Sequence, residues 1–71
     1  METGIYEHYK GNRYEVIDMV RHSETEELLV LYKTLYEPIG LWVRPYGMFF
    51  EKVIINGVET PRFKYLEDAH E

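Results

Sequence analysis

The chain contains no cysteine, which excludes disulfide bonds, thiolate nucleophiles and thiolate-bound metal centres together. Long apolar runs are also missing, because the longest, Leu28 to Leu31, is too short to cross a bilayer. The first residues have neither the basic nor the apolar segment of a signal peptide. These absences predict a small protein of the cytoplasm.

Positive charge is scarce, with eight Lys and Arg against 13 Asp and Glu, for a net charge of −5. General binding of nucleic acid or of an anionic membrane needs a basic surface, so both are disfavoured. The charge is unevenly spread, since residues 1–27 carry −4, residues 28–64 carry +2 and residues 65–71 carry −3. A local anion site is therefore compatible with an acidic chain.

Patterns for metal and cofactor binding are absent as well. The histidines are His8, His22 and His70, and no two of them lie at a metal-ligand spacing. The glycines that follow Gly4 are isolated turn residues, so no glycine-rich phosphate loop exists. We expect neither a metal site nor a cofactor.

What the chain does contain is short apolar and aromatic runs separated by turn signals, which is typical of an all-β protein. No helical period persists, so helices cannot supply the core. The pattern predicts a small SH3-like barrel or roll of five to six short antiparallel strands, in one domain over residues 1–65. Residues 66–71 are expected to form an acidic, disordered tail. The expected strands are 6–9, 13–21, 28–35, 41–44, 49–55 and 58–63, with a 3₁₀ turn at 45–48 and a hairpin turn at Asn56-Gly57.

The third predicted strand is apolar on both faces. Such a strand lies either under a covered outer surface or at a contact between subunits, and a small barrel gains stability from a partner. A protein-interaction or homodimerisation domain is therefore an alternative function, with the outer leucines as the contact. One face carries Leu28, Val30, Tyr32 and Tyr36, and the other carries Leu29, Leu31 and Leu35.

The single tryptophan stands one residue away from an arginine. On a strand, Trp42 and Arg44 share one face while Leu41 and Val43 share the other. An indole beside a guanidinium is common on binding surfaces, although aromatic side chains also cover small barrels. Arg44 and Arg62 are alternatively structural ion-pair partners of Glu51 or Glu59.

These residues suggest a binding face for an anionic, ring-bearing, nucleotide-like ligand or a short peptide. Aromatic side chains would stack on the ring, basic side chains would meet the charge, and a histidine would tune binding with pH. The candidate residues are Lys10, Arg21, His22, Tyr32, Tyr36, Trp42 and Arg44.

The polar segment around His22, residues 21–25, allows a catalytic interpretation. His22 would act as a general base, with Glu24 orienting it, in a hydrolase. Side chains in a tight hairpin splay outward, however, so a turn in which Ser23 and Thr25 bind the backbone is favoured. We therefore do not expect an enzyme.

Several short motifs together resemble the bacterial family known as domain of unknown function 1653, over about residues 6–63. The resemblance implies an SH3-type barrel in short cytoplasmic proteins that are sometimes fused to nucleotide-handling or hydrolase domains, and it implies no particular activity. One departure is Gly47, where the family usually has an acidic residue. The motifs are Tyr9-Lys10-Gly11, Tyr14-Glu15-Val16, Arg21-His22-Ser23-Glu24-Thr25, Leu41-Trp42-Val43-Arg44-Pro45, Met48-Phe49 and Pro61-Arg62-Phe63.

Overall fold

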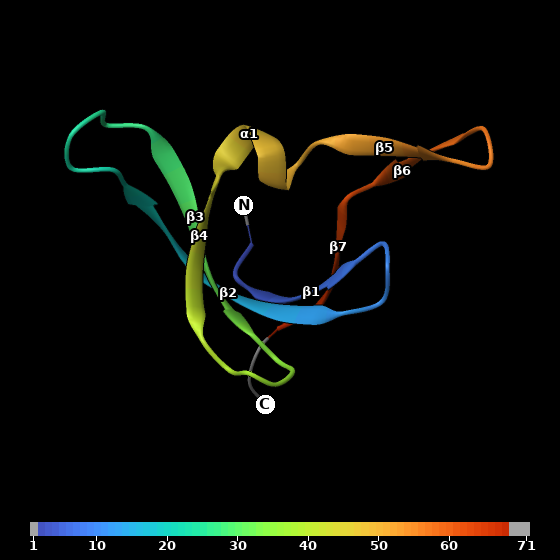
Figure 1. Ribbon diagram of the computed structural model, residues 1–71, viewed down its shortest axis with the longest axis horizontal. Coiled ribbons are helices and arrows are strands. Elements are labelled where there is room, and N and C mark those ends of the chain that lie inside the picture. The colour runs from blue at the N-terminus through green and yellow to red at the C-terminus, as the bar shows by residue number, and fades with distance from the viewer. Residues whose placement is uncertain (1, 69–71) are drawn as a thin grey trace.

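Seven strands and one helical turn make up the computed structural model of the chain, which describes residues 2–68. His70 of the predicted tail lies outside the described residues. The all-β class is confirmed, while the SH3-like label stays a prediction. The elements are β1 (Gly4–His8), β2 (Arg13–Arg21), β3 (Leu28–Thr34), β4 (Leu41–Pro45), α1 (Tyr46–Phe49), β5 (Lys52–Ile55), β6 (Val58–Pro61) and β7 (Phe63–Glu67), as Figure 1 shows.

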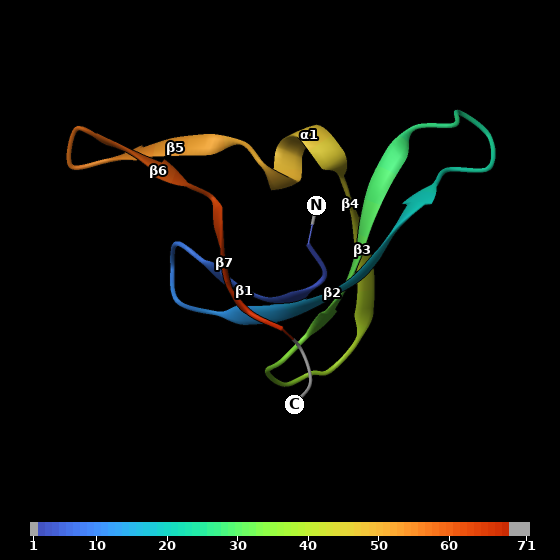
Figure 2. The same cartoon turned by 180° about the vertical axis from the view of Figure 1, so that it is seen from behind.

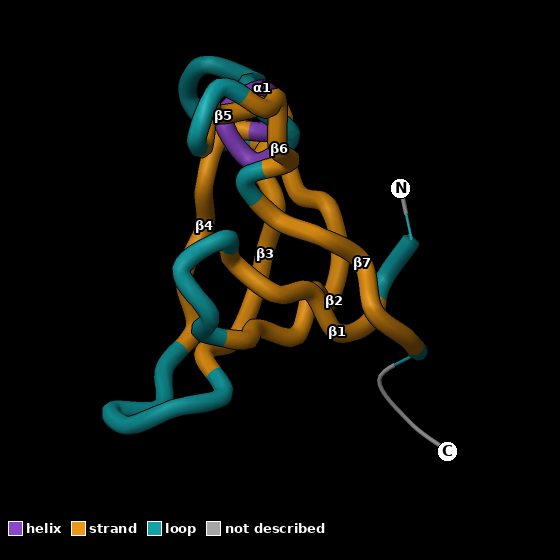
Figure 3. The backbone as a smooth tube through the Cα atoms, turned by 90° about the vertical axis from the view of Figure 1, so that its right-hand side faces the viewer, coloured by secondary structure: helices purple, strands orange, loops and turns teal. Residues whose placement is uncertain are grey.

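Five strands form one antiparallel sheet in the order β4-β3-β2-β1-β7, and β5 pairs only with β6. The sheet is twisted, so that β4 and β1 run in clearly different directions (Figure 1). The β5–β6 hairpin stands out from the sheet as an arm, which is also seen from behind (Figure 2). β4 and β7 are the two edges and lie on opposite sides of the molecule (Figure 3).

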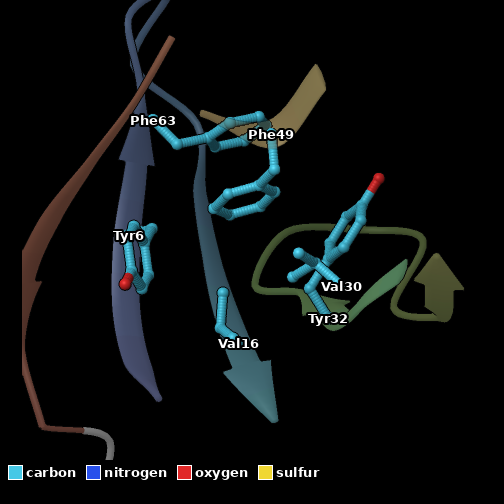
Figure 4. Close-up of a cluster of buried hydrophobic side chains, with 6 residues drawn as sticks. All are labelled: Tyr6, Val16, Val30, Tyr32, Phe49 and Phe63. Atoms are coloured by element: carbon cyan, nitrogen blue, oxygen red, sulfur yellow. The ribbon is translucent and has the colours of Figure 1, made fainter. Parts of the chain in front are cut away.

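The core lies on the inner face of the five-stranded sheet (Figure 4). Phe49 is fully buried, and its ring stacks on that of Phe63 at a centroid distance of 4.2 Å. The edge of the Tyr6 ring meets Phe49 at 5.4 Å. Aromatic stacking therefore joins α1 to the two strands at one end of the sheet. The buried cluster is Tyr6, Val16, Val30, Tyr32, Phe49 and Phe63.

The helical turn forms after β4 as predicted, but it has α rather than 3₁₀ geometry and includes Phe49, which we had assigned to a strand. The Phe50 N–H donates to the Tyr46 carbonyl at 3.3 Å, the spacing of an α-helix. The i, i+3 spacing from Tyr46 to Phe49 lets this turn direct Phe49 into the core, so β5 begins only at Lys52. Within residues 2–68, no helix is long and apolar enough to cross a membrane.

The predicted last strand is divided into β6 and β7, which raises the number of strands to seven. Arg62 separates the two, and its carbonyl accepts a hydrogen bond from the Tyr9 N–H at 3.0 Å. β7 then pairs with β1 and buries Phe63. This pairing extends to Glu67, two residues into the segment that we expected to be a tail. Pairing with the first strand explains the difference, because it supplies backbone partners that the local sequence does not reveal.

Candidate ligand-binding pocket

An open pocket of about 250 Å³ lies beside the loop between β3 and β4. That loop is at the bottom of Figure 1. Four of the seven predicted binding residues meet there. Three further residues line it that the sequence analysis did not single out. The lining residues are Tyr14, Tyr32, Thr34, Tyr36, Pro38, Trp42 and Arg44.

The register between β3 and β4 explains how the tryptophan and the arginine reach one pocket. Trp42 lies opposite Tyr32, and Arg44 lies opposite Val30. Residues opposite each other in a ladder share a face, so both side chains lie on the face that carries the core. The prediction that Trp42 and Arg44 share one face is thus confirmed. The Trp42 side chain is 56% exposed, which leaves its ring available to a ligand.

Three tyrosines form an aromatic wall. The Tyr14 ring meets Tyr32 and Tyr36 edge-on, at centroid distances of 5.3 Å and 5.5 Å. The Tyr14 and Tyr36 hydroxyls are 3.0 Å apart and share a hydrogen bond. Burial first, and then this hydrogen bond, raises the pKa of Tyr14 to about 12. At neutral pH its hydroxyl is therefore uncharged, and it places no negative charge next to Arg44.

Arg44 is the cation of the pocket. Its guanidinium lies over the Phe63 ring at 5.5 Å from the centroid. Its Nε is buried and has no hydrogen-bond partner within residues 2–68. None of the ion pairs among these residues includes Arg44. The positive charge of Arg44 therefore has no carboxylate partner among the described residues, which suits the guanidinium to an anionic ligand.

Arg62 is placed differently, as the ion-pair alternative predicted. Its Nη2 lies 3.2 Å from Oε1 of Glu51. Its Nε is also buried without a partner in the described part of the chain, but Arg62 does not line the pocket. Glu59, the other predicted partner, pairs with Lys52 at 3.8 Å.

Thr34 holds the loop that shapes the pocket. Its Oγ1 donates to the Pro38 carbonyl at 3.1 Å and accepts from the Gly40 N–H at 2.9 Å. Thr34 is buried, so solvent competes little for these bonds. The loop is thereby fixed at both of its ends, which positions Tyr36 and Pro38 on the pocket wall.

Arg21 and His22 lie at the far end of the β2–β3 hairpin, at the top left of Figure 1, away from the pocket. Nη1 of Arg21 donates to the Glu26 carbonyl at 2.9 Å. Nδ1 of His22 accepts from the backbone N–H groups of Glu24 at 3.0 Å and Thr25 at 3.3 Å. These contacts stabilise the turn, and neither residue lines the pocket.

Lys10 is in the turn between β1 and β2, with its Nζ 5.8 Å from the centroid of the Tyr9 ring. It does not line the pocket, and its charge acts on His8 instead. Burial first, and then the charges of Arg62, Arg44 and Lys10, lowers the pKa of His8. Positive charge thus gathers around His8, which does not line this pocket.

The leucines proposed for a dimer contact do not form one open surface. Leu29 is 8% exposed within the single chain, and Leu31 is half-buried. Leu35 lies beyond the end of β3, in the loop. Only Leu35 of the three is well exposed, at 40%, and a dimer through these leucines stays a prediction.

The comparisons with known proteins agree with the fold. Residues 4–65 match the family model described as protein of unknown function (DUF1653). A crystal structure of a DUF1653 protein from Bordetella bronchiseptica is similar over 100% of this chain and 94% of the other, with a TM-score of 0.89 and 32% sequence identity. A comparison with curated proteins finds no match. Because the family model covers most of the chain, this protein belongs to the DUF1653 family.

Proposed function

We propose that this protein is a small cytoplasmic binding module whose pocket takes an anionic, ring-bearing molecule of nucleotide-like chemistry. The observation that carries the proposal is Arg44, which lines a pocket of aromatic rings and forms no ion pair among residues 2–68. A phosphate or carboxylate group would supply the missing anionic partner, since a guanidinium binds either group through its N–H donors.

The ring of the ligand would stack on Trp42, with Tyr32 and Tyr36 beside it. Stacking of a base on an aromatic side chain is worth about 1–3 kcal/mol. The pocket is open and holds only about 250 Å³. It would therefore cover the ring and its nearest anionic group and leave the rest of the ligand in water.

The charge of the chain supports a short ligand rather than a nucleic acid. A net charge of −5 repels a long polyanion. The one guanidinium that lines the pocket, without an ion-pair partner among residues 2–68, suits a single anionic group. We therefore expect a mononucleotide to bind and long nucleic acids to bind poorly.

Calorimetric titration with adenosine monophosphate, adenosine and inorganic phosphate tests this function. Arg44→Gln keeps a hydrogen-bonding side chain but removes the charge, so we expect affinity for adenosine monophosphate to fall roughly tenfold, or about 1.4 kcal/mol, with little change for adenosine. Arg62→Gln is the matched control and should bind as the wild type does, because Arg62 lies outside the pocket.

Trp42→Ala should abolish binding while the protein stays folded, because the indole is more than half exposed. Unfolding of that variant would show that the indole belongs to the core, and the pocket would lose its stacking residue. Saturable binding of an acidic aromatic peptide, but not of the nucleotide, would assign the site to peptides instead. The absence of any saturable heat would refute the proposal.

A further inference from the structure

The two edges of the five-stranded sheet differ in how they are protected. β7 carries Lys64 and Glu67, and its ladder with β1 is interrupted between Ile5 and Tyr6. Charged side chains and irregular pairing are the usual means of keeping a sheet edge from pairing with another chain. β4 has an unbroken register with β3, and its protective features are limited to Arg44 on the inner face and Pro45 at its end.

β4 is also apolar on both faces of the sheet. Leu41 is 63% exposed and Val43 is 51% exposed, and Trp42 is exposed on the other face. Three consecutive exposed apolar residues on a free edge are a site for the addition of a strand.

One hydrogen bond shows which backbone groups of β4 point away from the sheet. The Thr34 N–H donates to the Gly40 carbonyl at 3.0 Å. Hydrogen-bonded pairs alternate along an antiparallel ladder, so Trp42 and Arg44 direct their backbone groups toward β3. The N–H and C=O groups of Leu41 and Val43 therefore point away from the sheet.

Pro45 ends this edge. It follows Val43 at the next outward-facing position, so its missing N–H falls on the free side and removes nothing from the ladder with β3. A strand added to β4 would find the donors and acceptors of Leu41 and Val43, together with the carbonyl of Pro45.

A second copy of β4 fits this edge. In an antiparallel pair related by a two-fold axis at Val43, Val43 meets its own counterpart and Leu41 meets Pro45 of the second copy. Trp42 then lies opposite Arg44 of the second copy, on the same face, so an indole and a guanidinium of the two chains are cross-strand neighbours. The contact is self-complementary, as a closed dimer requires.

We propose that two copies of this protein pair through β4 into one continuous antiparallel sheet. Leu41 and Val43 would form an apolar strip on the outer face, and two Trp42–Arg44 contacts would form on the inner face. The two pockets would adjoin across the axis, so that each would receive the Arg44 charge of the other copy. The pairing itself does not depend on the pocket's ligand.

Analytical ultracentrifugation of the full chain over a range of concentrations tests the proposal. The wild type should show a reversible monomer–dimer equilibrium. Val43→Lys places a charge on the outer face, away from the pocket, and should weaken the dimer roughly tenfold or more. Ile54→Lys adds the same charge at a position of β5 that is 68% exposed, and should leave the dimer unchanged. If circular dichroism shows that Val43→Lys is unfolded, Leu41→Lys takes its place.

Amide hydrogen exchange supplies a second measurement. The N–H groups of Leu41 and Val43 should exchange slowly in concentrated samples and rapidly on dilution, since only the dimer gives them acceptors. A wild type that is monomeric at millimolar concentration would overturn the proposal. So would a dimer that Val43→Lys and Ile54→Lys weaken equally, or a complex that forms only with an added peptide strand.

Discussion

A single hydroxyl, that of Tyr14, links the pocket to the pH dependence of stability. Its pKa in the folded protein is about 12, against 10.0 for a free tyrosine. Folding thus favours the neutral hydroxyl. The stabilisation that this gives the folded protein is complete below pH 10 and is lost as the pH rises toward 12. We expect the free energy of unfolding to fall over this range, and to fall less steeply for Tyr14→Phe. Urea unfolding at a series of pH values measures both slopes.

The pKa values of Tyr6 and Tyr65 are also raised, so Tyr14→Phe should reduce the slope without abolishing it. An identical slope in the variant and the wild type would contradict the prediction. It would show that neither burial nor the hydrogen bond to Tyr36 raises the pKa of Tyr14 in solution.

Residue positions within one strand could be predicted, whereas positions across strands could not. Alternation alone placed Trp42 and Arg44 on one face. Tyr14 was missed because its place opposite Thr34 depends on how β2 pairs with β3. That ladder shifts register between Val16 and Asp18, so no simple alternation along β2 would have shown which side chains reach the pocket.

The pairing of β1 with β7 depends on a glycine at the start of β1. Gly4 has a φ of +139°, and a Cβ there would lie 2.5 Å from the backbone oxygen of Glu67. Gly4→Ala should therefore lower the free energy of unfolding by about 1–3 kcal/mol, which urea denaturation measures. Gly47→Ala, in α1, is the matched control, because a Cβ added at Gly47 would have no other atom within 4 Å. It should be neutral or stabilising by up to about 1 kcal/mol, and equal losses in the two variants would refute this account.

Elements with a local signal were predicted well. Asn56-Gly57 turns β5 into β6, and both residues have the positive φ that a tight hairpin turn requires. β7 was not recognised, because its partner is the first strand of the chain and no local pattern shows so distant a contact. The end of the helical turn at Phe49 was not predicted for the same reason, because it depends on the burial of Phe49 against Phe63 of another strand.

At the scale of the whole molecule, stability should be unevenly distributed. The β5–β6 arm stands apart from the five-stranded sheet (Figures 1 and 2), and Ile54 and Val58 on it are exposed. A two-stranded hairpin alone is marginally stable in water. The arm is thus expected to unfold locally, whereas the amide hydrogens of Val16 and Val30 in the core should exchange only when the sheet unfolds.

Hydrogen exchange followed by NMR tests this division. Hydrogen-bonded amides of the arm should exchange on the order of 100-fold faster than those of Val16 and Val30. Gly4→Ala should accelerate exchange in the sheet and leave the arm unchanged, because Gly4 contacts β7 and not the arm. Equal protection of the arm and the core would contradict independent opening. It would mean that α1, which connects β4 to the arm and buries Phe49, makes the two sheets unfold together.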